Sequence, residues 1–93
     1  MLHTTKNFVT VEDSPGADFK SIKSALYWIG PFDIIKVNKG IYRENLKITK
    51  PITLIGQDKY HTIIDGGHNE NVITITANFV TISGFTIQNS GIG

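Results

Sequence analysis

The stretch ITLIG at residues 52–56 recurs as VTISG at residues 80–84, an offset of 28 residues. Two further segments repeat in the same order: LKIT at 46–49 matches ITIT at 73–76, and the Ile34-Ile35 pair matches the Ile63-Ile64 pair. Ile64 in turn matches Ile87, which begins a third copy. A period of roughly 20 to 50 residues indicates a solenoid or a propeller.

Short alternating runs fill each period, and no helix-length gap lies between any two of them after residue 33. Helical repeats are therefore excluded, and the period is too short for a propeller blade. The pattern predicts an all-β fold, a parallel β-helix of about two and a half coils, in which each strand pairs with its equivalent one coil on. Alternation places these residues inside, in stacked columns: Leu46, Ile48, Ile52 and Leu54 under Ile73, Ile75, Val80 and Ile82, with Thr53, Thr74 and Thr81 outside.

The segment before the repeats predicts a cap for the coils. NFVTV at 7–11 alternates like a short strand, and turn residues follow at 13–16. Apolar residues at helical spacing predict a helix over 18–29, with Asp18 as its N-cap and Gly30-Pro31 as its end. The stripe consists of Phe19, Ile22, Ala25, Leu26 and Ile29. We expect Ile22, Leu26 and Ile29 to pack on the first coil, near Ile35 and Val37.

The chain reads as one domain over residues 1–93: an entry strand and turn at 1–17, a capping helix at 18–30 and coils at 33–93. Because the third copy is incomplete, we expect the domain to be truncated at its C-terminal end, with an uncovered last coil. An uncovered strand edge pairs readily with another chain. The pattern therefore predicts a homodimer through the open C-terminal coil.

Composition excludes several functional classes. The formal net charge is +1, and nine Lys and Arg are scattered among eight Asp and Glu, so the basic stripe of a nucleic-acid partner is absent. No run approaches the ~20 apolar residues of a membrane span, so a membrane partner is not predicted either. Cysteine is absent from the chain, which leaves the compartment open. The protein is extracellular or on the cell surface if the native chain carries a signal peptide.

Five phrases carry a family resemblance: GADFKSIKSAL at 16–26, GIYRENL at 40–46, ITLIG at 52–56, TIIDG at 62–66 and FTIQN at 85–89. Together they resemble the N-terminal part of the pectin methylesterase and pectate-lyase-like superfamily of right-handed parallel β-helices, most closely its NosD-like and surface-protein branch. The resemblance covers about residues 8–91. It implies that the predicted fold is a right-handed parallel β-helix with a capping helix, and that the domain associates with polysaccharide.

The resemblance implies less about activity. The esterases use two Asp, an Arg and assisting Gln side chains on later coils, and Gln88 matches a frequent family position that is not catalytic. We therefore expect a non-catalytic module, structural or carbohydrate-associated, from the N-terminal part of a longer secreted or surface protein. The alternative is the N-terminal fragment of a pectin methylesterase or polysaccharide-lyase-like enzyme that lacks its catalytic coils.

The densest cluster of metal-ligand residue types is His61, Asp65, His68 and Glu70. Alternation places His61 and Asp65 on one face, but His68 lies beyond the Gly66-Gly67 turn, so a solvated turn is favoured over a metal site. Carboxylates of the kind that form glycosidase pairs or Ca²⁺ sites each stand near a turn, without a recurring acid-x-acid spacing: Asp33, Glu44, Asp58, Asp65 and Glu70. We therefore assign no catalytic, cofactor-binding or metal-binding residue, and we predict no cofactor.

Aromatic side chains are the remaining candidates, because they stack on sugar rings at exposed binding faces. They are Tyr27, Trp28, Tyr42 and Tyr60. Packing is the favoured interpretation for them, with Trp28 under the cap, and a polysaccharide partner is the alternative. A set of asparagines does not match the period, which argues against an internal amide ladder: Asn45, Asn78 and Asn89.

Overall fold

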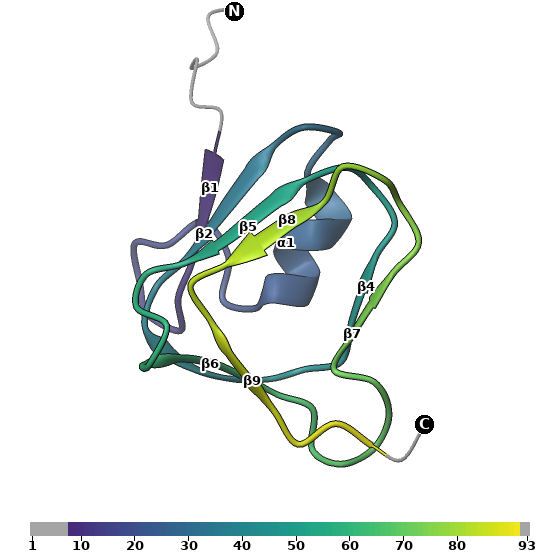
Figure 1. The fold of residues 1–93 in the computed structure, drawn as a ribbon. Coiled ribbons are helices and arrows are strands. Elements are labelled where there is room, and N and C mark those ends of the chain that lie inside the picture. The colour runs from purple at the N-terminus through teal and green to yellow at the C-terminus, as the bar shows by residue number, and fades with distance from the viewer. Residues whose placement is uncertain (1–7, 92–93) are drawn as a thin grey trace, which may run out of the picture.

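The computed structural model describes residues 8–91, so the entry residues 1–7 and residues 92–93 lie outside the described part. Within it the chain forms one helix and nine short strands (Figure 1). In chain order these are β1 (Phe8–Val11), α1 (Ile22–Trp28), β2 (Ile34–Val37), β3 (Gly40–Arg43), β4 (Leu46–Ile48), β5 (Thr53–Gly56), β6 (Thr62–Asp65), β7 (Ile73–Ile75), β8 (Thr81–Ser83) and β9 (Thr86–Gln88). The described helix is too short to span a membrane.

The strands form three parallel sheets that wall a solenoid. The first sheet has the order β1-β2-β5-β8, the second β3-β6-β9 and the third β4-β7. In Figure 1 the chain runs counterclockwise from β5 through β6 and β7, and β8 then lies in front of β5. A counterclockwise path that advances towards the viewer is right-handed, so the predicted right-handed parallel β-helix is confirmed.

Two predictions about the coils are wrong: their number, and the match between two of the isoleucine pairs. The first sheet is four strands deep, so the solenoid has about four turns rather than two and a half. The difference arises because the expected entry strand, β1, is itself a stacked strand that pairs with β2, from Phe8↔Ile34 to Val11↔Val37. The Ile34-Ile35 pair does not match the Ile63-Ile64 pair, because β2 and β6 belong to different sheets.

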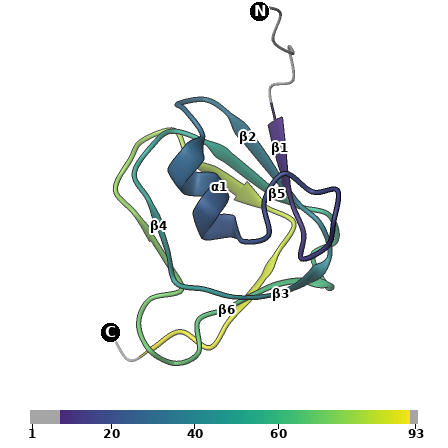
Figure 2. The same cartoon turned by 180° about the vertical axis from the view of Figure 1, so that it is seen from behind.

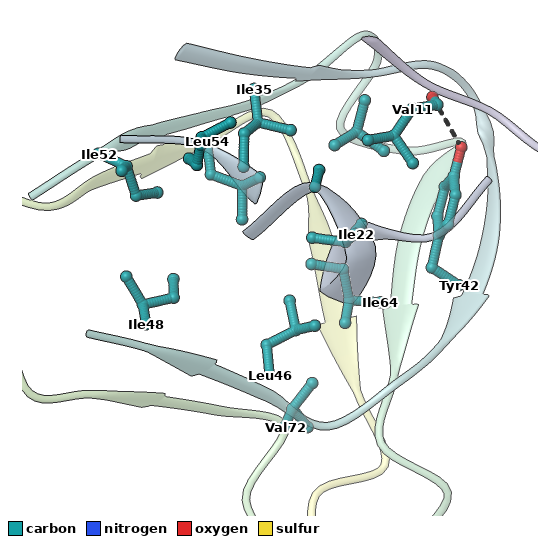
Figure 3. Packing of buried hydrophobic residues seen from close by; sticks show 13 residues of the cluster. Val11, Ile22, Ile35, Tyr42, Leu46, Ile48, Ile52, Leu54, Ile64 and Val72 are labelled. Atoms are coloured by element: carbon teal, nitrogen blue, oxygen red, sulfur yellow. Dashed lines mark hydrogen bonds between the residues drawn. The ribbon is translucent and has the colours of Figure 1, made fainter. Parts of the chain in front are cut away.

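The predicted columns are confirmed by the register. Leu46 pairs with Ile73, Ile48 with Ile75, and Leu54 with Ile82. In the inner coils these side chains are buried and meet in a single core (Figure 3). The alternation of buried and exposed positions along each strand therefore reports the inside and outside of the coil, as expected for strands of period two.

Strand β3 lies outside the repeated segments identified from the sequence. The isoleucine of this strand, Ile41, is exposed, whereas Tyr42 is only 5% exposed and its side chain reaches into the core. The Tyr42 hydroxyl donates to the carbonyl oxygen of Asn38 at 2.7 Å and lies 3.3 Å from that of Val11 (Figure 3). The ring can be buried without leaving the hydroxyl unsatisfied, because the hydroxyl has these hydrogen-bond partners.

The helix covers the N-terminal end of the solenoid, as predicted (Figure 2). Ile22, Ala25 and Ile29 are buried, and α1 packs against β1, β2 and β4. Leu26 is only partly buried against this core. The expected stripe is therefore confirmed with its centre at Ile22 and Ala25.

The predicted start of the helix is wrong. Ser21, not Asp18, is the N-cap, and its hydroxyl accepts from the Ser24 N–H at 3.1 Å. Residues 18–19 instead run along the outer edge of β1, where the Phe19 N–H donates to the Thr10 carbonyl and the Glu12 N–H to the Phe19 carbonyl. The free edge of a strand competes with the helix for these residues, and the edge wins because it satisfies backbone groups that otherwise lack partners.

Candidate functional site

The candidate carboxylates act on the backbone of their own turns and caps. Asp33 accepts from the Gly30 N–H at 2.8 Å, where the chain leaves the helix. Asp58 accepts from the Tyr60 N–H at 2.9 Å. Carboxylate bonds of this kind stabilise turns and helix ends, so each group has a structural role at its position.

Glu44 has such a role that sequence inspection missed. Its Oε2 accepts from the Ile22 N–H at 2.9 Å and its Oε1 from the Lys23 N–H at 2.8 Å. These are donors of the first turn of α1, which have no partner within the helix. Glu44 thus ties the turn after β3 to the cap across about 20 residues of sequence, which no local pattern signals.

A polar cluster on the outer end of the second sheet centres on Asp65. Its Oδ2 accepts from Asn89 Nδ2 at 2.8 Å and from Gln88 Nε2 at 3.2 Å, and its Oδ1 accepts from the Gly67 N–H at 2.8 Å. Gln88 and Arg43 are its register partners on either side. Gln88, the family position noted in the sequence, therefore supports Asp65 of the preceding coil.

The candidate metal-ligand residues do not converge. Thr62 and Ile64 of β6 are buried, so His61 and Asp65 share one face of the strand, as predicted, and this is the outer face. Four residues of strand separate them by roughly 13 Å. His61 Nδ1 instead lies 3.0 Å from Asp58 Oδ2, and among the described residues no three His, Asp or Glu side chains are placed to hold a metal ion.

Two of these aspartates make the stability of the domain dependent on pH. The hydrogen bond from the Gly67 N–H, followed by those from Gln88 and Asn89, lowers the pKa of Asp65 below its ordinary 3.8. The His61 side chain and the Tyr60 N–H lower the pKa of Asp58 in the same direction. A carboxylate whose pKa is depressed by folding stabilises the protein above its unfolded pKa, and this stabilisation is lost as pH falls through the folded pKa.

We therefore expect the melting temperature to fall on acidification below about pH 5. Asp65→Asn should lower the melting temperature near neutral pH and flatten this acid limb, because the titrating carboxylate is gone. Thermal unfolding followed by circular dichroism across the pH range measures both. Asp13→Asn, which removes the same charge at an exposed turn after β1, is the matched control. Equal acid limbs for Asp65→Asn and wild type would contradict the assignment.

A hollow of about 700 Å³ lies between the start of α1 and β3. Its charges are nearly balanced: Lys20, Lys23, Lys39 and Arg43 against Glu12, Asp13 and Glu44. This near balance gives the hollow no strong preference for an ion of either sign. Two of its acidic side chains are hydrogen-bonded within the protein: Glu44 accepts from the Ile22 N–H, and Glu12 accepts from Asn38 Nδ2 at 2.7 Å.

A second hollow, of about 610 Å³, lies at the far end of the helix. Tyr27 lines it together with Leu26 and three lysines, Lys23, Lys47 and Lys50. Tyr27 is 87% exposed and Trp28 75%, so the expected packing of Trp28 under the cap is wrong. Tyr42 is excluded from any sugar contact by its burial, whereas Tyr60 lies exposed on a different turn.

Two further exposed aromatics, Phe32 and Phe79, were missed by the sequence analysis. Phe32 lies two residues before β2 and Phe79 two residues before β8, and Pro51 lies two residues before β5. The first residues of these strands, Ile34, Thr53 and Thr81, are register partners, so the three preceding positions are equivalent in successive coils. The Phe32 N–H donates to the Pro51 carbonyl. Phe32, Pro51 and Phe79 thus form one corner of the coils, called here the aromatic corner. The sequence signal for this corner is that each residue lies two positions before a strand. This signal is recognised only once the register between β2, β5 and β8 is known.

The backbone of the aromatic corner is unusual. Phe32 has φ 66° and Phe79 φ 60°, in the left-handed region that bulky residues rarely occupy. Both rings are largely exposed, at 75% and 83%, so burial of the ring does not offset the conformational cost.

The asparagines form no ladder, in agreement with the sequence analysis. Asn45 Nδ2 donates to the carbonyls of Gly66 and Asn71, both at 3.1 Å, and so fastens the turn before β7. Asn89 belongs to the Asp65 cluster instead.

Comparison with known proteins leaves the chain without a family assignment. No protein-family profile matches its sequence, and no curated protein is significantly similar to it.

Proposed function

We propose that this domain is a non-catalytic β-helix module that associates with polysaccharide through the aromatic corner and the adjoining end of α1. The observation that carries the proposal is the exposure of Phe32 and Phe79 in a left-handed backbone. Strained residues that persist without a packing benefit are candidates for function, and exposed apolar rings mark binding surfaces.

The spacing of the corner suits an extended sugar chain. Neighbouring strands of a sheet lie about 4.8 Å apart, so Phe32 and Phe79, two strands apart, are separated by roughly 10 Å along the stack. Two sugar units of an extended chain span a similar length. Tyr27 and Trp28 add aromatic faces at the end of the helix that leads into this corner, and lysines line the hollow beside Tyr27.

The carboxylates support a non-catalytic module. Hydrolysis of a glycoside or an ester by carboxylates requires two groups that converge on one bond, whereas Asp33, Glu44, Asp58 and Asp65 each hold backbone groups of separate turns. We expect the pure protein to release neither methanol from methyl-esterified pectin nor unsaturated product from polygalacturonate above a buffer blank. Either product would favour the enzymatic alternative.

The binding test uses substitutions that remove the ring without harming the backbone. Asparagine tolerates the left-handed region better than phenylalanine, so Phe32→Asn and Phe79→Asn should leave the melting temperature unchanged or raise it. We expect the wild-type protein to be retarded in native gels that contain one or more members of a panel of neutral and acidic polysaccharides, and the double variant to lose this retardation.

Tyr60→Ala is the matched control, because Tyr60 is 70% exposed on a turn away from the corner. It should keep the wild-type retardation. A wild-type protein that migrates unretarded with every polysaccharide, or a double variant that binds as the wild type does, would contradict the proposal.

A further inference from the structure

The aromatic corner consists of three equivalent positions in consecutive coils. Phe32, Pro51 and Phe79 precede β2, β5 and β8, which are neighbours in the first sheet. The Phe32 N–H donates to the Pro51 carbonyl, and one residue further along the Thr81 N–H donates to the Ile52 carbonyl at 3.0 Å, so the stacking of the coils extends to this corner. Neighbouring strands lie about 4.8 Å apart. The three apolar side chains therefore form a straight track along the axis of the solenoid.

The track is uncharged, and the charged residues next to it in sequence, Asp33 and Lys50, are turned to other tasks. Lys50 Nζ donates to the Ile29 carbonyl, and Asp33 Oδ2 accepts from the Gly30 N–H, so both bind the backbone where the helix ends. Phenylalanine and proline side chains carry no hydrogen-bonding group. A ligand that matches the track is therefore neutral and meets it with apolar C–H groups, as the faces of pyranose rings do.

The track lies on a convex edge of the molecule. The chain bends here from the third sheet into the first, between β4 and β5 and again between β7 and β8 (Figure 1). Both rings are largely exposed, and neither hollow described above includes Phe32, Pro51 or Phe79. A convex edge contacts a sugar chain from one side only. It therefore suits a chain that lies in a flat layer of other chains, as at the surface of an insoluble fibre.

We infer that the aromatic corner binds neutral β-1,4-linked glycan chains, in their extended two-fold form, at the surface of an insoluble fibre. This inference rests on the proposed function and names its ligand class. In a two-fold ribbon successive pyranose units are turned by half a rotation, so every second unit presents the same face.

The spacing of the track favours this form of chain. One unit of an extended glycan is close to one strand spacing in length, and Phe32 and Phe79 precede strands that lie two apart in the sheet. The two rings therefore stack on units of the same orientation, and Pro51 faces the unit between them. A three-fold chain presents the same face only after three units, so it would match one ring and miss the other.

Cosedimentation of the 93-residue chain with microcrystalline cellulose, an insoluble β-1,4-linked glucan, tests this inference. We expect the wild-type protein to enter the pellet. The double variant Phe32→Asn, Phe79→Asn should lower the partition coefficient at least about tenfold, because both stacking contacts are lost. Tyr60→Ala is again the matched control and should pellet as the wild type does. Circular dichroism confirms the folding of each variant.

A charge placed in the middle of the track provides an independent variant. Pro51→Lys keeps both rings and the carbonyl to which the Phe32 N–H donates. We expect it to fold and to bind cellulose more weakly than the wild type, because a neutral ligand cannot pair with the charge that it covers. A folded Pro51→Lys protein that pellets as the wild type does would overturn the inference, as would a double variant that pellets fully.

Failure of the ligand class is distinguishable from failure of the proposed function. A wild-type chain that stays in the supernatant with cellulose overturns the inference. If the same chain is retarded in gels by another polysaccharide, and the double variant is not, the proposed function stands with a different ligand class. If no polysaccharide retards the wild-type chain and cellulose does not pellet it, both are overturned.

Discussion

A Gly56→Ala variant is expected to be largely unfolded, or to lose more than about 3 kcal/mol of unfolding free energy. Gly56 ends β5, and the β5–β8 register continues from Ile55↔Ser83 to place it beside Gly84 of the next coil. A Cβ atom on Gly56 would overlap the carbonyl oxygen of Gly84 and lie 2.8 Å from its carbonyl carbon. Phe85 Cδ1 would be 3.2 Å away.

The expected loss is large because the obstacle is backbone. A flexible side chain turns away from a new methyl group, but the Gly84 carbonyl is fixed by the pairing of β5 with β8. The coils would have to separate locally, which breaks the column of buried side chains beside them. A domain of this size has roughly 5 to 14 kcal/mol of stability in total, so the loss is a substantial fraction of it.

Urea or thermal unfolding followed by circular dichroism measures the effect. Gly30→Ala is the matched control, since a Cβ there would lie 3.8 Å from its nearest neighbour, Asp33 Oδ2, and the residue is not among those with positive φ. We expect its stability to stay within about 0.5 kcal/mol of the wild type or to rise slightly. If the Gly56→Ala and Gly30→Ala proteins unfold alike, the coils are not in the contact described.

Ile22→Ala should cost about 2 to 5 kcal/mol. Ile22 is fully buried in the first turn of α1, at the closed end of the core (Figure 3). Its backbone N–H is held by Glu44 Oε2, so the helix cannot readily sink to fill the cavity that the smaller side chain leaves. The cost of a truncation increases when the site cannot collapse.

Equilibrium unfolding of the Ile22 variant is compared with that of two others. Ile41→Ala removes the same atoms from a residue that is 57% exposed, and we expect a loss below about 1 kcal/mol. Leu26→Ala should fall between the two, because Leu26 is only partly buried against the core. A loss for Ile22→Ala no greater than that for Ile41→Ala would show that the helix does not close the solenoid.

The two glycines of this contact also explain a feature of the sequence. Gly56 and Gly84 are the last residues of the repeated stretches ITLIG and VTISG. The repeat was visible from the sequence, but its cause was not. The glycines recur because two backbones approach too closely for a Cβ atom on either residue, and this approach exists only when consecutive coils are stacked.

The candidate site was less accessible to sequence analysis than the fold. Strand alternation placed His61 and Asp65 on one face, and the structure shows that this is the outer face of β6. Glu44 at the helix, Asp65 with Asn89, and Phe32 in line with Phe79 are pairs that lie 22 to 47 residues apart in sequence. Neither alternation nor helical spacing relates residues at such distances.

The sequence by itself determined that this chain is a parallel β-helix capped by a helix, and it determined which side chains of the regular strands face inward. These are consequences of local periodicity, since successive side chains of a strand alternate between two faces. Only the tertiary structure decided the number of turns, the start of α1 at Ile22, the inward place of Tyr42 and the composition of the aromatic corner. Each of these depends on register between coils of unequal length: 19 residues separate Ile34 from its partner Thr53, and 28 separate Thr53 from Thr81. The turns absorb this difference, so no single period relates all the coils, and the sequence repeat reveals the register only for the strands within residues 46–56 and 73–84.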